Sequence, residues 1–457
     1  MPHDVNLITT IAAGLGLAMV FGFVAARLRL PPLVGYLLAG ILIGPNTRGF
    51  VADVALAGQL AEIGVMLLMF GVGLHFSLDD LASVRGIALP GAVVQIVVAT
   101  ALGTMTAMFW GWSFGAGLVF GLALSVASTV VLLRALESRG ALETFNGRIA
   151  VGWLIVEDLV MVLVLVLLPP LANVLGGAAP GADAGPGLGA ALAITFGKVG
   201  AFIVLMLVVG RRLFPRILWL VAKSGSRELF TLCVIAAAVG VAYGAAALFG
   251  VSFALGAFFA GMMMRESSFS HRAADESLPL RDAFAVLFFV SVGMLFDPAV
   301  IVREPLAVLA VVGIIMFGKT LAAIALVLLL RYPLNTALIV GASLAQIGEF
   351  SFILAGLGVE YRLLPEEGRS LILAGALISI ALNPAVFAAI EPAQRWIRAR
   401  SELARKLERR TDPLAELPTS VDASLLTGHV AIVGYGRVGK RIAAALREQN
   451  VPFTIAE

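Results

Sequence analysis

Charged residues are scarce in this chain of 457 residues: Asp, Glu, Lys and Arg together make up 13% of it, while 60% is hydrophobic. Soluble proteins carry about 25% charged residues, and the mean hydropathy here reaches +1.00. The shortage of charge therefore excludes a soluble globular protein and favours one that lies in a lipid bilayer.

Cysteine and histidine are also rare. The one cysteine, Cys233, lies inside an apolar run, which excludes a disulfide framework and a cysteine metal site. The four histidines are scattered without metal-ligand spacing. The net charge is only +3, and the basic residues lie in short loops and one tail, so nucleic acid is not an expected partner. The first residues lack the basic segment of a cleavable signal, so we expect the first apolar run to be retained.

Apolar runs long enough to cross a bilayer as helices recur almost from end to end. They predict about thirteen transmembrane helices, of which the second and the ninth are short for a full crossing. The expected spans are 6–26, 31–44, 54–74, 87–110, 115–136, 147–169, 190–210, 228–249, 252–265, 282–296, 305–330, 334–357 and 370–390.

Arginine and lysine gather in every second connecting loop. With the N-terminus outside, the odd loops are cytoplasmic and hold most of these residues, whereas the outside loops hold only Arg48, Arg303, Arg362 and Arg369. The positive-inside rule requires this asymmetry. An odd number of spans places the C-terminus in the cytoplasm. We therefore expect a multi-pass protein of the bacterial inner membrane.

A loop rich in Gly, Ala and Pro at 170–189 divides the spans into six, a linker span and six more. Since the first six start outside and the last six inside, the halves would be inverted repeats, as in many secondary transporters. Residues 1–391 then form the membrane domain and 392–427 a basic cytoplasmic linker. Residues 428–457 predict a strand, a helix and a second strand, the start of a Rossmann-like α/β domain of a longer protein.

Two adjacent carboxylates, Glu157 and Asp158, lie in the middle of the sixth span, GWLIVEDLVMVLVLVLLP. Acids at this depth cost several kcal/mol; the structural alternatives are a helix end near water or an ion pair. An ionised carboxylate here binds a desolvated cation, and burial favours the protonated form when no cation is present. A group that holds either ligand, but not both, is the minimum device for exchange. The pair therefore predicts a monovalent cation site coupled to protons.

Lys319 is a further charge inside an apolar run, the eleventh span. A buried ammonium needs a counter-ion. We expect Glu157 or Asp158 to supply it; the alternative is a lysine whose side chain reaches a membrane interface.

Polar residues interrupt two other spans: Ser128 and Thr129 in the fifth, and Gln346, Gly348 and Glu349 in the twelfth. These spans correspond if the halves repeat, and such pairs indicate a midplane site built from broken helices. Serine and threonine also line ordinary helix contacts in membranes. Glu349 is expected either in the ion pathway or at the cap of a helix break.

The C-terminal strand HVAIV is followed by the glycine turn Gly434-Tyr-Gly436-Arg437-Val-Gly439, a helix and a second strand that ends at Glu457. Glycines in this context allow close approach to phosphate, and the helix N-terminus favours its charge. An acid at the end of the second strand accepts hydrogen bonds from ribose hydroxyls. The pattern predicts a regulatory nucleotide, NAD(H) or AMP; the alternative is a glycine turn without a ligand.

This combination of motifs resembles the monovalent cation:proton antiporter family, in its Kef/YbaL branch, with the start of a regulatory nucleotide-binding domain of the RCK/KTN type. The resemblance implies a homodimer in which spans 4–6 and 11–13 form a core domain that moves like an elevator. It also implies that Asp158 is the essential ion ligand, Glu157 its neighbour, Lys319 the partner of that neighbour, and Thr129 the polar residue at the broken helix. The potassium-efflux Kef proteins carry Gln before the aspartate, where this chain has Glu157.

The function expected is therefore proton-coupled exchange of a monovalent cation, with K⁺ favoured and Na⁺ possible, by a transporter that is not an enzyme and needs no cofactor for transport. A nucleotide-gated monovalent cation channel or efflux system is the alternative, although no TVGYG-like filter sequence is present. A nucleotide-dependent oxidoreductase or a membrane sensor is a third possibility, without a companion catalytic set in the sequence.

Overall fold

The computed structural model describes residues 6–47, 50–75, 78–142, 144–178, 188–265, 267, 269–400, 430–433, 436–449, 451 and 453–456. Contacts divide the chain into two compact units, Met1–Glu408 and Arg409–Glu457. The first is helical throughout its described part, so the predicted class, an all-α polytopic membrane protein, is confirmed.

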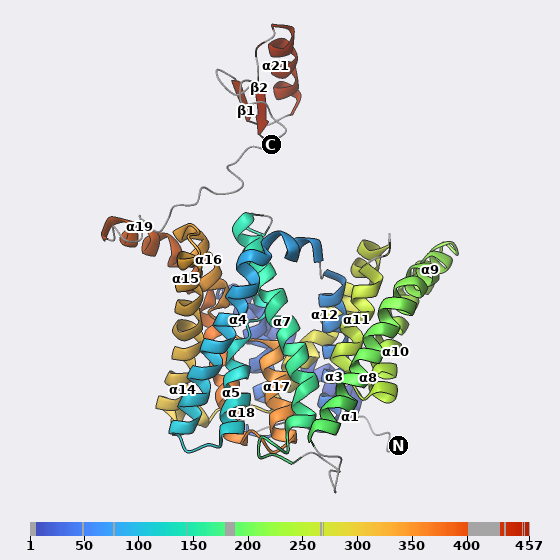
Figure 1. The fold of residues 1–457 in the computed structure, drawn as a ribbon, viewed down its shortest axis with the longest axis vertical. Helices are drawn as coiled ribbons and strands as arrows, with labels where there is room; N and C mark the ends of the chain where they lie inside the picture. The colour runs from blue at the N-terminus through green and yellow to red at the C-terminus, as the bar shows by residue number, and fades with distance from the viewer. Residues whose placement is uncertain are drawn as a thin grey trace. The chain divides into compact units, whose positions relative to one another are not determined.

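One group of helices lies on the right of the membrane unit in Figure 1. Gly73 and Gly261 mark a close crossing within it, because a Cβ on either residue would lie 2.1–2.2 Å from a carbonyl oxygen of the facing helix. Small residues at such crossings let membrane helices approach closely. The group comprises α1 (Asn6–Arg27), α2 (Pro32–Ile43), α3 (Val54–His75), α10 (Arg227–Phe249), α11 (Phe253–Arg265) and α12 (Ser270–Met294), with α3 packed along both α11 and α12.

A second group, on the left and in the centre of Figure 1, contains a hydrophobic cluster that includes Trp153, Val340 and Phe387. It contains the predicted spans 4–6 and 11–13, and α4 packs against α5, α7 and α15. Its members are α4 (Leu78–Phe109), α5 (Phe114–Ser125), α6 (Thr129–Glu137), α7 (Phe145–Leu171), α14 (Pro305–Gly313), η2 (Ile314–Gly318), α15 (Lys319–Leu329), α16 (Leu334–Leu344), α17 (Glu349–Glu360) and α18 (Glu366–Ala388).

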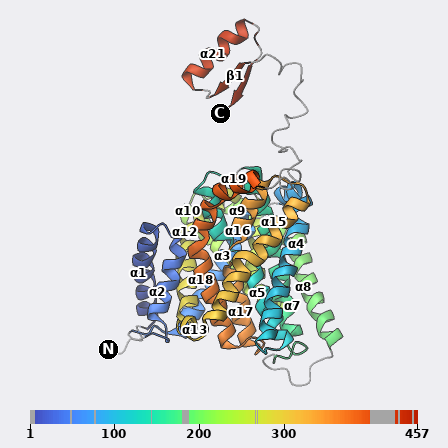
Figure 2. The same cartoon turned by 90° about the vertical axis from the view of Figure 1, so that its left-hand side faces the viewer.

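The remaining helices connect or follow these groups. A long linker consists of α8 (Leu188–Leu205), the π-helical turn η1 (Met206–Gly210) and α9 (Arg211–Ala222). The short α13 (Val300–Arg303) precedes α14, and α19 (Ile390–Arg400) follows α18. Figure 2 shows α8 at the edge of the membrane unit, beside α7.

Ten helices of the described chain are long and apolar enough to cross a membrane, and α16 with α17 adds an eleventh span that is bent by 41° at its break. The shorter apolar helices α2 and α11 coincide with the second and ninth predicted spans. All the predicted apolar segments are thus helical. The difference from the expected thirteen lies in the two helices that the sequence already indicated to be short.

The second unit contains two parallel strands, β1 (Val430–Val433) and β2 (Phe453–Ala456), which pair with Val430 opposite Phe453. Helix α21 (Arg437–Glu448) connects them and packs on β1. Ile432 of the strand and Ala443 of the helix are buried. This is the strand–helix–strand unit that the sequence predicts.

Candidate cation site at the crossing of two broken helices

Two helices of the second group are interrupted at their middle. α5 ends at Ser125 and α6 begins at Thr129, with Val126 and Ser128 in extended conformations between them. The hydroxyl of Ser128 accepts the Val131 N–H and so caps α6. The second break lies at residues 345–348, between α16 and α17. Both predicted broken spans, the fifth and the twelfth, are therefore present.

The two breaks meet and are joined by hydrogen bonds. The Ser128 N–H donates to Oε1 of Gln346 at 2.9 Å, and Nε2 of Gln346 donates to the Ser128 carbonyl at 3.1 Å. The side chain of Gln346 thereby satisfies backbone groups that a continuous helix would pair internally. Sequence reasoning recognised Gln346 as part of a break but did not foresee this cross-link.

Both acids of α7 are buried beside the first break. Oδ2 of Asp158 accepts the Thr129 hydroxyl at 3.0 Å, and Oε2 of Glu157 accepts the Ala127 N–H at 2.8 Å. Their exposed fractions are 3% for Asp158 and 0% for Glu157. The alternative of a helix end near water is thus excluded, and Thr129 lies where the prediction requires it.

Glu349 is buried at the start of α17, and the Ser128 hydroxyl donates to its Oε2 at 2.8 Å. Glu349 is thus the first residue of the half-helix after the second break, and its role in an ion pathway stays a prediction. The Ser128 hydroxyl therefore accepts from the Val131 N–H as the cap of α6 and donates to Glu349.

Lys319 is completely buried, so the alternative of an interfacial lysine is wrong. Its ammonium donates to the Gln346 carbonyl at 2.6 Å, and its charge interacts with that of Glu157. The described residues contain no direct ion pair between Lys319 and either acid of α7. A carbonyl of the broken helix therefore binds the ammonium, and of the two expected counter-ions Glu157 is the neighbouring charge.

Three carboxylate oxygens at this crossing, Oε1 of Glu157, Oδ1 of Asp158 and Oε1 of Glu349, have no hydrogen-bond partner within the described part of the chain. A buried carboxylate oxygen without a donor is costly unless a proton or a cation satisfies it. Hard oxygen ligands of this kind suit alkali cations as well as protons. Among the described residues, however, no three His, Cys, Asp or Glu side chains are grouped so that they could hold one metal ion.

Two amides that sequence reasoning missed support the breaks. Nε2 of Gln95 in α4 donates to the Ser125 carbonyl at 2.8 Å, and Nδ2 of Asn383 in α18 donates to the Ala342 carbonyl at 2.9 Å. Both side chains are buried. The available signal was an isolated amide within an apolar run, which is weaker than that of a charge.

The predicted nucleotide motif is described in part. Gly436 precedes α21, and Gly439 is buried within it. Arg437 is the first residue of this helix, while Gly434 and Glu457 lie outside the described residues. Within the described residues a strand precedes the helix, and nucleotide binding by this motif stays a prediction.

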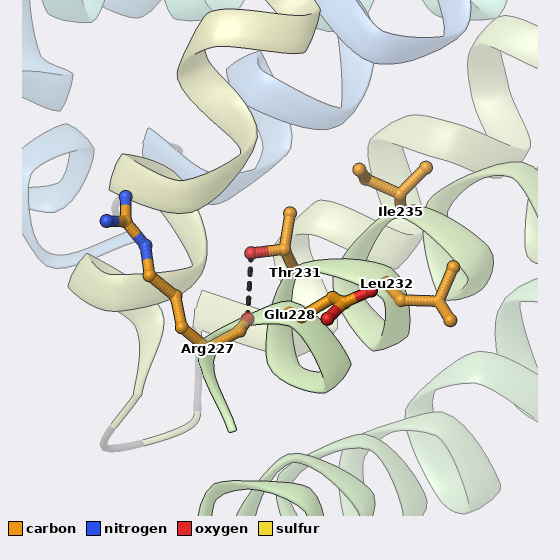
Figure 3. A pocket seen from close by; sticks show the side chains of 5 residues that line it. All are labelled: Arg227, Glu228, Thr231, Leu232 and Ile235. Atoms are coloured by element: carbon orange, nitrogen blue, oxygen red, sulfur yellow. Dashed lines mark hydrogen bonds between the residues drawn. The ribbon is translucent and has the colours of Figure 1, made fainter. Parts of the chain in front are cut away.

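A separate surface cleft of about 530 Å³ lies along α10 (Figure 3). Arg227, Glu228, Thr231, Leu232 and Ile235 line it, and the Thr231 hydroxyl donates to the Arg227 carbonyl at 3.0 Å. Arg227 also donates to Oε2 of Glu276 at 2.8 Å. None of the predicted site residues lines this cleft, so it does not belong to the cation site.

Helices broken at a shared midpoint around buried acids define a polytopic ion exchanger. The transmembrane domain of the sodium/hydrogen exchangers matches residues 15–390, so the chain belongs to this family of cation/proton antiporters.

Several proteins that are similar to this chain are also named as antiporters. YbaL of Escherichia coli (strain K12), named as a candidate cation/proton antiporter, is 56% identical over 458 residues, which cover 100% of this chain and 80% of that protein. K(+) efflux antiporter 4 of Arabidopsis thaliana is 33% identical over 386 residues, 84% of this chain and 64% of that protein. The structure of the sodium proton antiporter MjNhaP1 from Methanocaldococcus jannaschii covers 88% of this chain and 99% of its own, with a TM-score of 0.65. At 15% identity it shows a shared fold alone.

Proposed function

We propose that this chain exchanges a monovalent cation for protons by alternating access, with Asp158 as the central ligand. The observation that carries the proposal is the state of this carboxylate: it is buried, one oxygen is held by Thr129, and the other has no partner within the described residues. The membership of an antiporter family supports the same reading.

Competition for one buried carboxylate provides the coupling. An ionised, unoccupied acid is costly away from water, so the site crosses the membrane either with a cation or with protons bound. A cation that binds from one side displaces the protons, and protons from the other side displace the cation. The two ligands are thus obliged to move in opposite directions.

The cation we favour is K⁺, with Na⁺ as the other candidate. Relatives named as K(+) efflux antiporters support K⁺, whereas the relative of known structure is named as a sodium proton antiporter. Carboxylate and hydroxyl oxygens bind both cations, so the choice depends on the spacing of the ligands.

We further propose a homodimer in the bacterial inner membrane, with the N-terminus outside and the C-terminus in the cytoplasm. The bias of arginine and lysine toward the odd loops supports this orientation. The second group of helices would move against the first. The C-terminal unit would bind NAD(H) or AMP and regulate transport.

The proposal is tested with purified protein in liposomes that hold a pH gradient and a fluorescent pH indicator. Addition of K⁺ or Na⁺ in separate titrations should collapse the gradient in wild-type vesicles but not in protein-free ones. Cation flux that carries current without moving protons would contradict proton-coupled exchange. It would instead favour the alternative function, a nucleotide-gated cation channel.

A further inference from the structure

The two neighbouring acids of α7 face different partners. Successive residues of a helix are rotated by about 100° relative to each other, so they do not face the same neighbour. Glu157 accepts the Ala127 N–H and interacts with the charge of Lys319. Asp158 accepts the Thr129 hydroxyl. Both acids thus contact the first break, and the contact with Thr129 places Asp158 next to Ser128, the residue whose hydroxyl binds Glu349.

Glu349 and Asp158 share a similar environment. Each is buried, and each has one oxygen bound by the hydroxyl of one of two consecutive residues, Ser128 for Glu349 and Thr129 for Asp158. Each keeps a second oxygen, Oε1 of Glu349 and Oδ1 of Asp158, that has no partner in the described chain. Glu157 also keeps an oxygen without a partner, Oε1, but its charge lies near that of Lys319, so Asp158 and Glu349 are the two acids without a neighbouring cationic side chain among the described residues.

We propose that Glu349 is the second proton carrier and ligand of the cation site, so that binding of one monovalent cation releases one proton from Asp158 and one from Glu349. Glu157 remains ionised throughout as the counter-charge of Lys319. This inference rests on the proposed exchange function and specifies its second acid and its stoichiometry.

The balance of charge around the crossing favours this assignment. Glu157 and Lys319 offset each other, which leaves Asp158, Glu349 and the cation with one uncompensated negative charge. The N-termini of α6 and α17, which begin at Thr129 and Glu349, meet at this point, where the Ser128 hydroxyl binds the Glu349 carboxylate. A helix N-terminus carries about half a positive charge. Two of them offset the remaining negative charge, so both acids can ionise when the cation is bound.

The consequence for transport is net movement of charge. Two protons cross in one direction for each monovalent cation that crosses in the other, which transfers one positive charge per cycle. Exchange is therefore driven by the membrane potential at about 2.3 kcal/mol per charge per 100 mV.

The test counts protons in two independent ways. Potassium chloride or sodium chloride is added to purified protein in weakly buffered detergent solution with a pH indicator, and bound cation is measured in parallel. In liposomes, the opposing cation and proton gradients at which flux stops give the coupling ratio. We expect two protons per cation for the wild type and one for Glu349→Gln, whose amide oxygen still accepts the Ser128 hydroxyl.

The matched control is Glu157→Gln combined with Lys319→Gln, which removes both offsetting charges together. We expect this double variant to release two protons per bound cation in detergent, whatever its transport rate. A Glu349→Gln protein that still releases two protons, or a double variant that releases one, would overturn the assignment of Glu349. Failure of the wild type itself to exchange or to release protons would instead disprove the proposed function.

Discussion

Gly348 lies against Ser128 so closely that a Cβ added to Gly348 would stand 2.2 Å from the Cβ of Ser128. Real Cβ atoms do not approach so closely, and the neighbour is not the end of a flexible side chain. The crossing of the two broken helices therefore requires glycine at this position, because any side chain would push α17 away from the first break.

Gly348→Ala should accordingly destabilise the crossing by about 1–3 kcal/mol, the usual cost of overpacking. It should also slow exchange, since Gln346 and Glu349 on either side would lose their hydrogen bonds to Ser128. Thermal melting in detergent and exchange in liposomes measure the two effects. Gly356→Ala is the matched control, because a Cβ at that position in the same helix meets no atom within 4 Å. Equal behaviour of both variants would contradict the prediction.

Asp158→Asn should abolish exchange while the protein stays folded. The amide has nearly the shape of the carboxylate and still accepts the Thr129 hydroxyl, but it can neither ionise nor titrate. The assay is the cation-induced collapse of a pH gradient, with melting temperature as the check of folding. Asp275→Asn, which changes an exposed aspartate of α12, should exchange at the wild-type rate. Normal exchange by the Asp158 variant would remove this residue from the site.

Lys319→Ala should lower the melting temperature more than Lys319→Arg or Lys319→His. Removal of the ammonium leaves the Gln346 carbonyl unpaired and the charge of Glu157 uncompensated, and breaking a buried pair of charges costs about 3–5 kcal/mol. Lys198→Ala, at an exposed lysine of α8, provides the control. If all three variants of Lys319 have the melting temperature of the wild type, the Lys319 ammonium does not stabilise the fold through a buried partner.

The sequence predicted best those features that each segment needs by itself, independently of its neighbours in the fold. A span must be apolar along its own length, so the helices were predictable from the order of residues, including the shortness of α2 and α11. Charges inside a span are costly enough to stand out, which identified Glu157, Asp158 and Lys319 as buried groups.

The partners of these groups were less predictable because they depend on the rotation of each helix and on packing between distant segments. Adjacency suggested that Glu157 and Asp158 act as a pair, yet they accept hydrogen bonds from different residues of the first break, Ala127 and Thr129. Likewise, the first contact of Lys319 is a carbonyl exposed by a break in α16 and α17, and the sequence of a break does not show which of its carbonyls remains free.

The full-length protein should bind ligands with a free ribose 2′-hydroxyl, NAD(H) or AMP, more tightly than NADP(H). Glu457 follows the second strand, where an acid accepts a hydrogen bond from that hydroxyl but repels a 2′-phosphate. Isothermal calorimetry with NADH and NADPH measures the preference. Glu457→Ala should reduce the difference in affinity between NADH and NADPH, whereas Glu448→Ala, at the exposed end of α21, should leave it unchanged. Tighter binding of NADPH to the wild type would show that Glu457 does not contact the ribose.

Gln95 should support the first break as Lys319 supports the second. Each lies on the helix that precedes a broken span, and each donates to a carbonyl at that break: Gln95 to Ser125 at 2.8 Å and Lys319 to Gln346 at 2.6 Å. Gln95→Met keeps the size of the side chain but leaves the Ser125 carbonyl without its donor, which costs about 1–3 kcal/mol for a buried group. The variant also removes Oε1 of Gln95, which lacks a partner among the described residues. The net loss of stability should therefore lie at the lower end of this range.

Thr106→Val is the control in the same helix, because the Thr106 hydroxyl donates to the Leu102 carbonyl of α4 itself. We expect a lower melting temperature and slower exchange for Gln95→Met alone, with an unchanged number of protons per cation, because no charge is altered. A changed proton count would mean that Gln95 acts on the acids directly and not through the position of the broken helix.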